Sequence, residues 1–394
     1  MTSLPPQDPN QPQLPFADFP EGPAPPEPPA PDFLAPVQPP PFTPEPPLFQ
    51  SISAWAPPPE RTPNFGHAAL LAIFALIGLL CASLLAQLAL SHHLFGIHTT
   101  RRAAEDIHYT LGTEAIIYLV TLLISVVVFP FVWRQSFFRG IHWRGFAALR
   151  LRYRLFAAAA LCFLLAMFNG VVMPGPSNAP IDRLFCTPGA AWILFAFGVT
   201  FAPFFEELAF RGFLLPSFCT AYDWIVEQLT TPANPLQPPR PLLAARTVAD
   251  IFLALPIFAL MPYHHVGYLP RTLFLSAWVF VLAVWWLFAT LRQPHRAPAP
   301  TPLLDSDGHP LWSFHAMTVA SVLTSVPFAL MHGEQTSYAL GPFLLLVAVS
   351  LVLSWTRLLT RSLASSVLVH ASYNFLLFGF MFLGTSGFRH LDRM

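Results

Sequence analysis

Long runs of apolar residues, separated by short polar connections, are the feature that most limits what this chain can fold into. Several runs reach about 18 residues, the length that an α-helix needs to cross a bilayer. Charged residues make up only 10% of the 394-residue chain, whereas soluble domains carry roughly 25%. The sequence therefore predicts an all-α fold, a polytopic transmembrane helical bundle of about 8–9 spans.

The expected spans are spread over the chain after its first 64 residues, and the range in their number reflects the short fifth and seventh runs. No internal repeat relates one group of spans to another. The expected spans cover about residues 67–90, 114–133, 155–173, 189–205, 248–261, 272–291, 314–331, 340–355 and 363–383.

Residues 1–64 form a segment of different composition. They hold about half of the 45 prolines and have no basic residue before Arg61. Such a segment buries too little apolar surface to offset the entropy of ordering it, so we expect a disordered, Pro-rich cytoplasmic tail. It is either a plain solvated tail or a ligand for a proline-binding module. The transmembrane domain then covers residues 65–394, and its motif-bearing core about 190–383.

Arginine supplies all the positive charge of the chain, which contains no lysine and has a net charge of zero. The lack of a dense basic patch argues against a nucleic-acid partner. The most basic loop of the chain follows the second expected span. By the positive-inside rule this loop is cytoplasmic, and so is the N-terminus. We expect an integral protein of the plasma (inner) membrane. The arginines of this loop are Arg134, Arg139, Arg144, Arg150, Arg152 and Arg154.

Two adjacent carboxylates and an arginine stand at the end of the fourth apolar run. Glu207 and Arg211 are four residues apart, so they share a helix face and can form an ion pair. Glu206 lies about 100° around the helix from Glu207, so the two carboxylates point in different directions. We expect one carboxylate to be the working group and the other to be held by the arginine.

Polar residues also interrupt two later spans. Phe328 lies one turn before His332, and His370 lies one turn before Asn374, so each pair shares one face of its helix. Polar side chains at membrane depth are costly unless they face the protein interior. We therefore expect these residues to meet Glu206, Glu207 and Arg211 inside the bundle.

This set of residues is suited to amide hydrolysis by water. A buried carboxylate can act as a general base, a histidine can hold the water or carry its proton, and an asparagine can stabilise an oxyanion. Equally, Glu206, His332 and His370 could form a zinc site with an open position for water. The spacing leaves both possibilities open.

Other residues that could carry chemistry have simpler explanations. No GxSxG, GxxxxGK[ST] or HExxH motif is present. Ser365 and Ser366 are better explained as small helix-packing residues, and a single intramembrane histidine such as His332 is often only an interhelical hydrogen-bonding group. The cysteines have no CxxC spacing, which favours buried apolar roles over disulfides or metal binding. They are Cys81, Cys162, Cys186 and Cys219.

In this order and on separate helices, the motifs resemble those of the CPBP family. This family comprises the CAAX proteases and bacteriocin-processing intramembrane proteases, also called the Abi family, and it includes the type II CAAX prenyl endopeptidases. The resemblance covers about residues 190–383. The segments that carry it are Glu206-Glu207-x-x-x-Arg211-Gly212, Phe328-x-x-x-His332 and His370-x-x-x-Asn374.

The resemblance implies an intramembrane endopeptidase whose site opens toward the cytoplasm and acts on a peptide or protein substrate, including membrane-anchored ones. It implies that Glu206 and His332 activate the attacking water, that His370 and Asn374 complete the site or stabilise the oxyanion, and that Glu207 with Arg211 holds the geometry. Because the family has been described both as metalloproteases and as glutamate proteases, zinc stays open as a cofactor. The Pro-rich tail and the Pro-rich inserts depart from the family pattern and bear on how a substrate enters.

Two other classes of function compete with the enzyme. A non-catalytic membrane immunity or scaffold protein could keep the same fold and bind a partner, and it would tolerate Glu206→Gln. A proton-coupled transporter could also use a chain of glutamates and histidines. A transporter predicts inverted repeats, which the sequence lacks.

Overall fold

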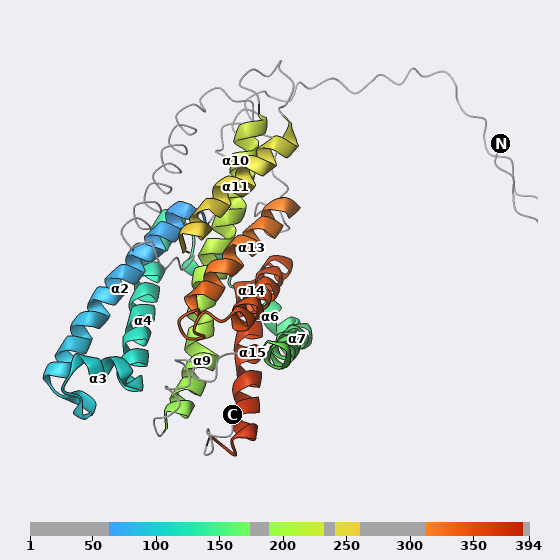
Figure 1. Cartoon of the computed structure of the whole chain (residues 1–394). Helices are drawn as coiled ribbons and strands as arrows, with labels where there is room; N and C mark the ends of the chain where they lie inside the picture. The colour runs from blue at the N-terminus through green and yellow to red at the C-terminus, as the bar shows by residue number, and fades with distance from the viewer. Residues whose placement is uncertain (1–62, 174–188, 232–240, 261–311, 389–394) are drawn as a thin grey trace, which may run out of the picture. The chain divides into compact units, whose positions relative to one another are not determined.

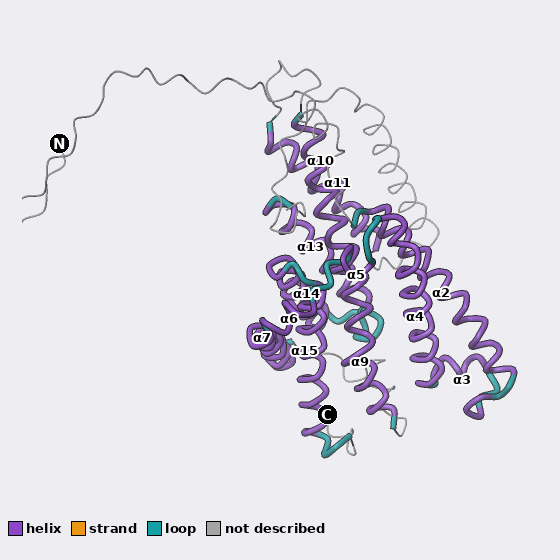
Figure 2. The backbone as a smooth tube through the Cα atoms, turned by 180° about the vertical axis from the view of Figure 1, so that it is seen from behind, coloured by secondary structure: helices purple, strands orange, loops and turns teal. Residues whose placement is uncertain are grey.

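A computed structural model describes residues 63–173, 189–231, 241–260 and 312–388 of the chain (Figure 1). Within these ranges every regular element is a helix and no strand occurs (Figure 2). The expected all-α class is therefore confirmed. The expected tail up to residue 62 and the expected span at 272–291 lie outside the described residues, as does Cys186.

Seven of the described helices are long and apolar enough to cross a membrane. They identify an integral membrane protein and match seven of the nine expected spans. The expected span at 248–261 falls within α11, Leu242–Leu260, which is not among the seven. The seven are α2, Phe65–Ser91; α4, Ile107–Trp133; α7, Arg152–Val172; the continuous stretch Ala190–Thr230; α13, Phe314–Met331; α14, Leu340–Thr360; and α15, Leu363–Gly384.

Helices α2 and α4 lie side by side as a pair (Figure 1). Asn64 begins α2 with a capping box, in which the Asn64 side chain accepts from the His67 backbone and the His67 ring accepts from the Asn64 backbone. Gly78 lets the two backbones approach, because a Cβ there would stand 2.8 Å from the carbonyl oxygen of Ile117. Small residues at such crossings are typical of membrane helices.

The connection between α2 and α4 is partly helical. It contains the 3-10 turn η1, Leu94–Gly96, and the short helix α3, Thr100–Glu105. Asp106 then caps α4 by accepting hydrogen bonds from the backbone N–H groups of His108 and Tyr109. This cap explains why the second span begins at Ile107 and not near residue 114.

The arginine-rich segment after α4 forms two short helices, α5, Phe137–Gly140, and α6, Gly145–Arg150. It is attached to the turn between α14 and α15. Arg357 donates to Nδ1 of His142 at 2.8 Å, and the backbone N–H of Leu363 donates to the carbonyl of His142 at 3.1 Å. Ser362 adds a hydrogen bond to the carbonyl of Arg144 at 3.1 Å.

The fourth span does not end where the sequence predicted. Helix α9, Ala190–Glu207, passes through a π-helical segment, η2, Leu208–Leu214, directly into α10, Leu215–Thr230. The residues between the expected fourth and fifth spans were expected to connect them, and this was wrong up to Thr230 because the chain stays helical there. Pro216 stands in the first turn of α10, where its missing N–H group and fixed φ are tolerated.

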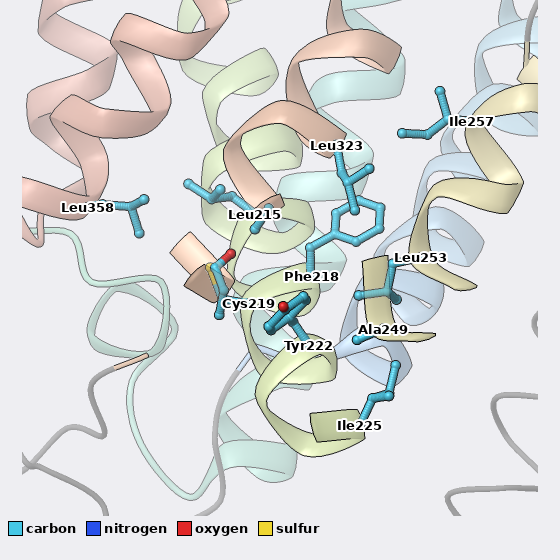
Figure 3. Packing of buried hydrophobic residues seen from close by; sticks show 12 residues of the cluster. Leu215, Phe218, Cys219, Tyr222, Ile225, Ala249, Leu253, Ile257, Leu323 and Leu358 are labelled. Carbon is cyan, nitrogen blue, oxygen red and sulfur yellow. The ribbon is translucent and has the colours of Figure 1, made fainter. Parts of the chain in front are cut away.

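Helix α10 continues because one of its faces is apolar and buried. Figure 3 shows Leu215, Phe218 and Cys219 of α10 among side chains from α11, α13 and α14. Burial of this face favours the helix over a loop, despite the polar residues of the segment. The partners that Figure 3 labels are Ala249, Leu253 and Ile257 of α11, Leu323 of α13 and Leu358 of α14.

The remaining contacts bring the motif-bearing ends of three helices together. Helix α15 packs on α9 and α7, and α13 packs on α14 and α10. Gly198 of α9 faces the ring of Phe378 on α15, where an added Cβ would lie 3.0 Å from the ring. The C-terminal end of α9, the end of α13 and the first half of α15 therefore face one another.

Candidate active site

Most of the polar residues expected to meet inside the bundle do meet there, and Asn374 is the exception. Glu206 and Glu207 are the last residues of α9, and Arg211 lies in η2. His332 follows the last residue of α13, and His370 lies in α15. A π-helical segment at this point is notable because such segments are frequent at functional sites.

Glu207 is the centre of a buried hydrogen-bond network. Its Oε1 accepts from Nη1 of Arg211 at 2.8 Å and from Nδ1 of His370 at 3.0 Å. The side chains of Glu207 and Arg211 are both 0% exposed. The expected Glu207–Arg211 pair is therefore confirmed, and it extends to a histidine on another helix.

Arg211 is held from three sides. Besides Glu207, its Nη2 donates to Oγ of Ser350 at 2.7 Å and to the carbonyl of Ser350 at 3.1 Å. Its guanidinium lies 4.5 Å from the centre of the Phe328 ring, a favourable cation–π distance. The Phe328 ring also packs edge-on against His332 at 5.1 Å and His370 at 5.9 Å.

Glu206 is placed differently from its neighbour. Its side chain is 11% exposed, and its Oε2 lies 3.6 Å from Nε2 of His332 and 3.8 Å from Nε2 of His370. Both distances are too long for a hydrogen bond. Among the described residues, Oε2 of Glu206 is buried without a hydrogen-bond partner. Such an atom between two ring nitrogens has the surroundings that a bound water needs.

The second nitrogen of each histidine determines which atom faces Glu206. Nδ1 of His370 lies on the carboxylate of Glu207, and Nδ1 of His332 lies 3.2 Å from Oε1 of Gln335. Since both partners are acceptor oxygens, each Nδ1 carries a hydrogen and donates it. The Nε2 atoms of both rings are then directed at Glu206 with their tautomers fixed.

The charge of Glu206 acts on His332, which lies just beyond the end of α13. Burial alone would lower the pKa of His332, but the neighbouring Glu206 raises it above its ordinary value, with smaller contributions from Gln335 and Glu114. The carboxylate favours the imidazolium because opposite charges stabilise each other in a low-dielectric site.

Asn374 lies on α15 as expected but points to a different partner. Its Nδ2 donates to the backbone carbonyl of Gly198 at 2.7 Å. Gly198 precedes Glu206 by eight residues, about two helical turns. This hydrogen bond joins α15 to α9 at the close crossing beside Phe378.

Four residues near the site were not singled out from the sequence. Ser350 has no signal in a single sequence, because its partner Arg211 lies 139 residues away. Gln335 lies three residues after His332, but beyond the end of α13, where helix spacing predicts no contact. Glu114 and Tyr118 of α4 form a hydrogen bond of 2.5 Å, from the Tyr118 hydroxyl to Oε1 of Glu114. Glu114 could have been singled out from the sequence, because a carboxylate within an apolar span indicates a functional site.

The zinc alternative depends on whether Glu206, His332 and His370 fit a metal ion. Two ligands of one tetrahedral zinc ion lie about 3.3 Å apart, whereas Oε2 of Glu206 is 3.6 and 3.8 Å from the two nitrogens. Within the described residues, no group of three or more His, Cys, Asp or Glu side chains is arranged to hold a metal ion. As they lie in this structure, these three side chains are not arranged as a metal site, and the reaction is therefore derived for protein groups and water.

Comparison with known proteins supports the resemblance seen in the motifs. Residues 302–376 match the family described as type II CAAX prenyl endopeptidase Rce1-like. The match spans α13, α14 and most of α15 and includes His332, His370 and Asn374, while Glu206 and Glu207 lie outside it. No curated protein and no solved structure matches the chain.

Proposed function

We propose that this chain, a membrane protein of the CAAX protease family through its match to the type II CAAX prenyl endopeptidase Rce1-like family, is an intramembrane endopeptidase. The observation that carries the proposal is the buried, unpartnered Oε2 of Glu206 between the Nε2 atoms of His332 and His370. A peptide bond is the substrate class because this set supplies a base, a proton donor and a water position.

In the proposed reaction, Glu206 is the general base. A water donates one hydrogen bond to Oε2 of Glu206 and the other to Nε2 of His370, which leaves its oxygen lone pair directed at a peptide carbonyl. The water oxygen bonds to the carbonyl carbon, and its proton moves to Glu206. The site is buried enough for such preorganised groups to act strongly on the developing charge.

His332 completes the reaction as the proton donor. Its raised pKa keeps it protonated to a higher pH than an ordinary histidine. As the C–N bond breaks, Nε2 of His332 gives its proton to the leaving amine, and the ring regains a proton from Glu206. Each proton is thereby accounted for and the starting state of the pair is restored.

The other residues of the motifs are positioning residues. Glu207 fixes the tautomer of His370, Arg211 neutralises Glu207, and Phe328 packs against both histidines. The geometry favours water orientation by His370 over an oxyanion role, because its Nδ1 hydrogen is committed to Glu207. For Asn374, the hydrogen bond to the Gly198 carbonyl favours a role in holding α15 on α9.

The setting of the activity follows from the sequence. A site between membrane helices suits a membrane-anchored peptide or protein, and the arginine-rich segment favours a cytoplasmic N-terminus in the plasma (inner) membrane. Selection of a prenylated substrate is the finer part of this proposal, and it rests on the family match alone.

The test is peptidase activity of the purified protein in detergent, with synthetic peptide libraries as substrate. Wild type should cleave, Glu206→Gln should lose about 10²-fold to 10⁴-fold in kcat/KM, and Glu105→Gln, in the exposed Arg101–Glu105 pair, should match wild type. Cleavage that stops in chelator and returns with zinc would contradict the metal-free chemistry. Full activity of Glu206→Gln would contradict the proposal and leave the non-catalytic alternative.

A further inference from the structure

A surface pocket lies where α6 meets α7, and the proposed peptidase chemistry does not use it. Its volume is about 410 Å³, and the side chains that line it are Phe146, Leu149 and Arg150 of α6 and Arg152, the first residue of α7. Helix α7 is one of the seven helices long and apolar enough to cross a membrane. The pocket therefore stands at the end of a span, where lipid headgroups meet the protein.

Helix α6 presents an exposed face to this pocket while another part of it is held by the bundle. Ala148 is 4% exposed and packs with side chains of α7, α14 and α15, and α6 lies beside α7 and α15 (Figure 2). Phe146 is 83% exposed and Leu149 is 62% exposed. Because Phe146 lies three and four residues before Leu149 and Arg150, these side chains share one helix face. Two apolar side chains thus stand next to arginines on a fixed surface.

The two arginines of the pocket have no carboxylate partner in the part of the chain that the structure describes. Arg152 donates to the Leu149 carbonyl at 3.1 Å and to the Tyr153 hydroxyl at 3.3 Å, which orients its guanidinium. The sequence has no acid nearby either, since no Asp or Glu occurs between Glu114 and Asp182. The pocket therefore combines uncompensated positive charge with an apolar wall, which suits an amphipathic anion.

We propose that this pocket binds an anionic phospholipid, with the phosphate on Arg150 and Arg152 and the start of an acyl chain on Phe146 and Leu149. The planar guanidinium of arginine pairs with phosphate through parallel N–H···O bonds. The apolar wall at the end of a span favours a lipid over a free phosphate ion or an acidic peptide. The absence of a carboxylate to receive a choline cation favours an anionic headgroup over a zwitterionic one. This inference does not depend on the peptidase function.

The test titrates the purified protein in detergent with dioleoyl phosphatidylglycerol or dioleoyl phosphatidylcholine and measures bound lipid by native mass spectrometry. Wild type should bind phosphatidylglycerol more tightly. Arg150→Gln should lower this affinity about fivefold, and adding Arg152→Gln should lower it by a similar factor again. Phe146→Ser should also lower it, because the acyl chain loses apolar contact. Arg139→Gln is the matched control, an exposed arginine of the same segment that does not line the pocket, and it should have little effect.

Four results would overturn the inference. Equal affinities of the wild type for the two lipids would exclude a site for an anionic headgroup. Equal losses in Arg139→Gln and Arg150→Gln would assign the binding to the overall charge of the segment and not to the pocket. Displacement of the lipid by equimolar inorganic phosphate would make the ligand a free phosphate, and displacement by a polyglutamate peptide would make it an acidic peptide. If Arg150→Gln does not fold, Phe146→Ser decides by the same titration.

Discussion

The α2–α4 pair and the bundle of α9, α13, α14 and α15 belong to the same membrane domain but are joined by different contacts. The pair meets through a small residue and an edge-to-face ring contact, with Gly78 against the backbone of Ile117 and Phe74 against Phe129 at 5.7 Å. The bundle is joined through charges and hydrogen bonds, with Arg211 reaching Glu207 and a serine of α14.

This difference separates helices that are held by close packing from helices whose polar contacts fix the candidate site. Lipid tails are as apolar as leucine, so membrane helices associate by close packing or by polar contacts. Close packing tolerates small rotations of a helix, whereas a buried ion pair with a shared histidine fixes three helices at particular angles. The bundle therefore holds the geometry of the candidate site, and the α2–α4 pair packs against α9 and η2 beside it.

The largest expected effect is on the polar contacts of the bundle. Arg211→Met leaves the Glu207 carboxylate buried and unpaired, so it should lower the free energy of unfolding in detergent by about 3–5 kcal/mol. Arg101→Met, in a pair that is 90% and 69% exposed, should have little effect. A stable Arg211→Met protein would show that the ion pair is not what holds the bundle.

The next effect is on the close packing of the pair. Gly78→Ala places a Cβ 2.8 Å from the Ile117 carbonyl oxygen, so thermal unfolding should show a loss of about 1–3 kcal/mol. Gly112→Ala in α4, where an added Cβ meets nothing within 4 Å, is the matched control and should be neutral or stabilising. Equal effects of the two changes would contradict the close-approach account of α2 and α4.

A smaller effect is expected where α15 meets α9. Asn374→Leu removes the hydrogen bond to the Gly198 carbonyl and should cost about 1 kcal/mol in the same unfolding measurement. Thr200→Val removes a hydrogen bond that stays within α9 and serves as the control. A loss of catalysis with unchanged stability would assign Asn374 to the reaction instead.

The smallest effect concerns the pH dependence of the proposed reaction. Gln335 helps to raise the pKa of His332, and a raised pKa keeps the proton-donating form present to higher pH. Gln335→Leu should therefore move the alkaline limb of the kcat/KM profile to lower pH, measured against Glu334→Gln. A shift to higher pH, or none, would contradict the role of His332 as the proton donor.

The sequence predicted those parts of the site that depend on positions within one helix. Glu207 with Arg211 and Phe328 with His332 are each four residues apart, and helix geometry makes such pairs neighbours. The sequence also predicted that three helices converge, because polar side chains at membrane depth are costly unless they contact one another. The hydrogen bond between His370 and Glu207 was not predicted, because it depends on the rotational setting of α9 and α15 about their axes.

The fold was less predictable where local and tertiary preferences conflict. The fourth span was expected to end near residue 205, but the buried face of α10 against α11 and α13 keeps the chain helical to Thr230. Ser350 gave no signal because its partner, Arg211, is set by the packed structure. The span expected at 272–291 lies outside the described residues and stays a prediction.

The most direct test of the division of labour between the two adjacent carboxylates compares Glu206→Gln with Glu207→Gln, measuring both unfolding and peptide cleavage for each. Glu206→Gln should unfold like wild type and fail to cleave, because Oε2 of Glu206 has no hydrogen-bond partner among the described residues to lose. Glu207→Gln should unfold more easily, because it leaves Arg211 buried without its counter-ion. The reverse pattern, with Glu206→Gln unstable but active and Glu207→Gln stable but inactive, would contradict the account.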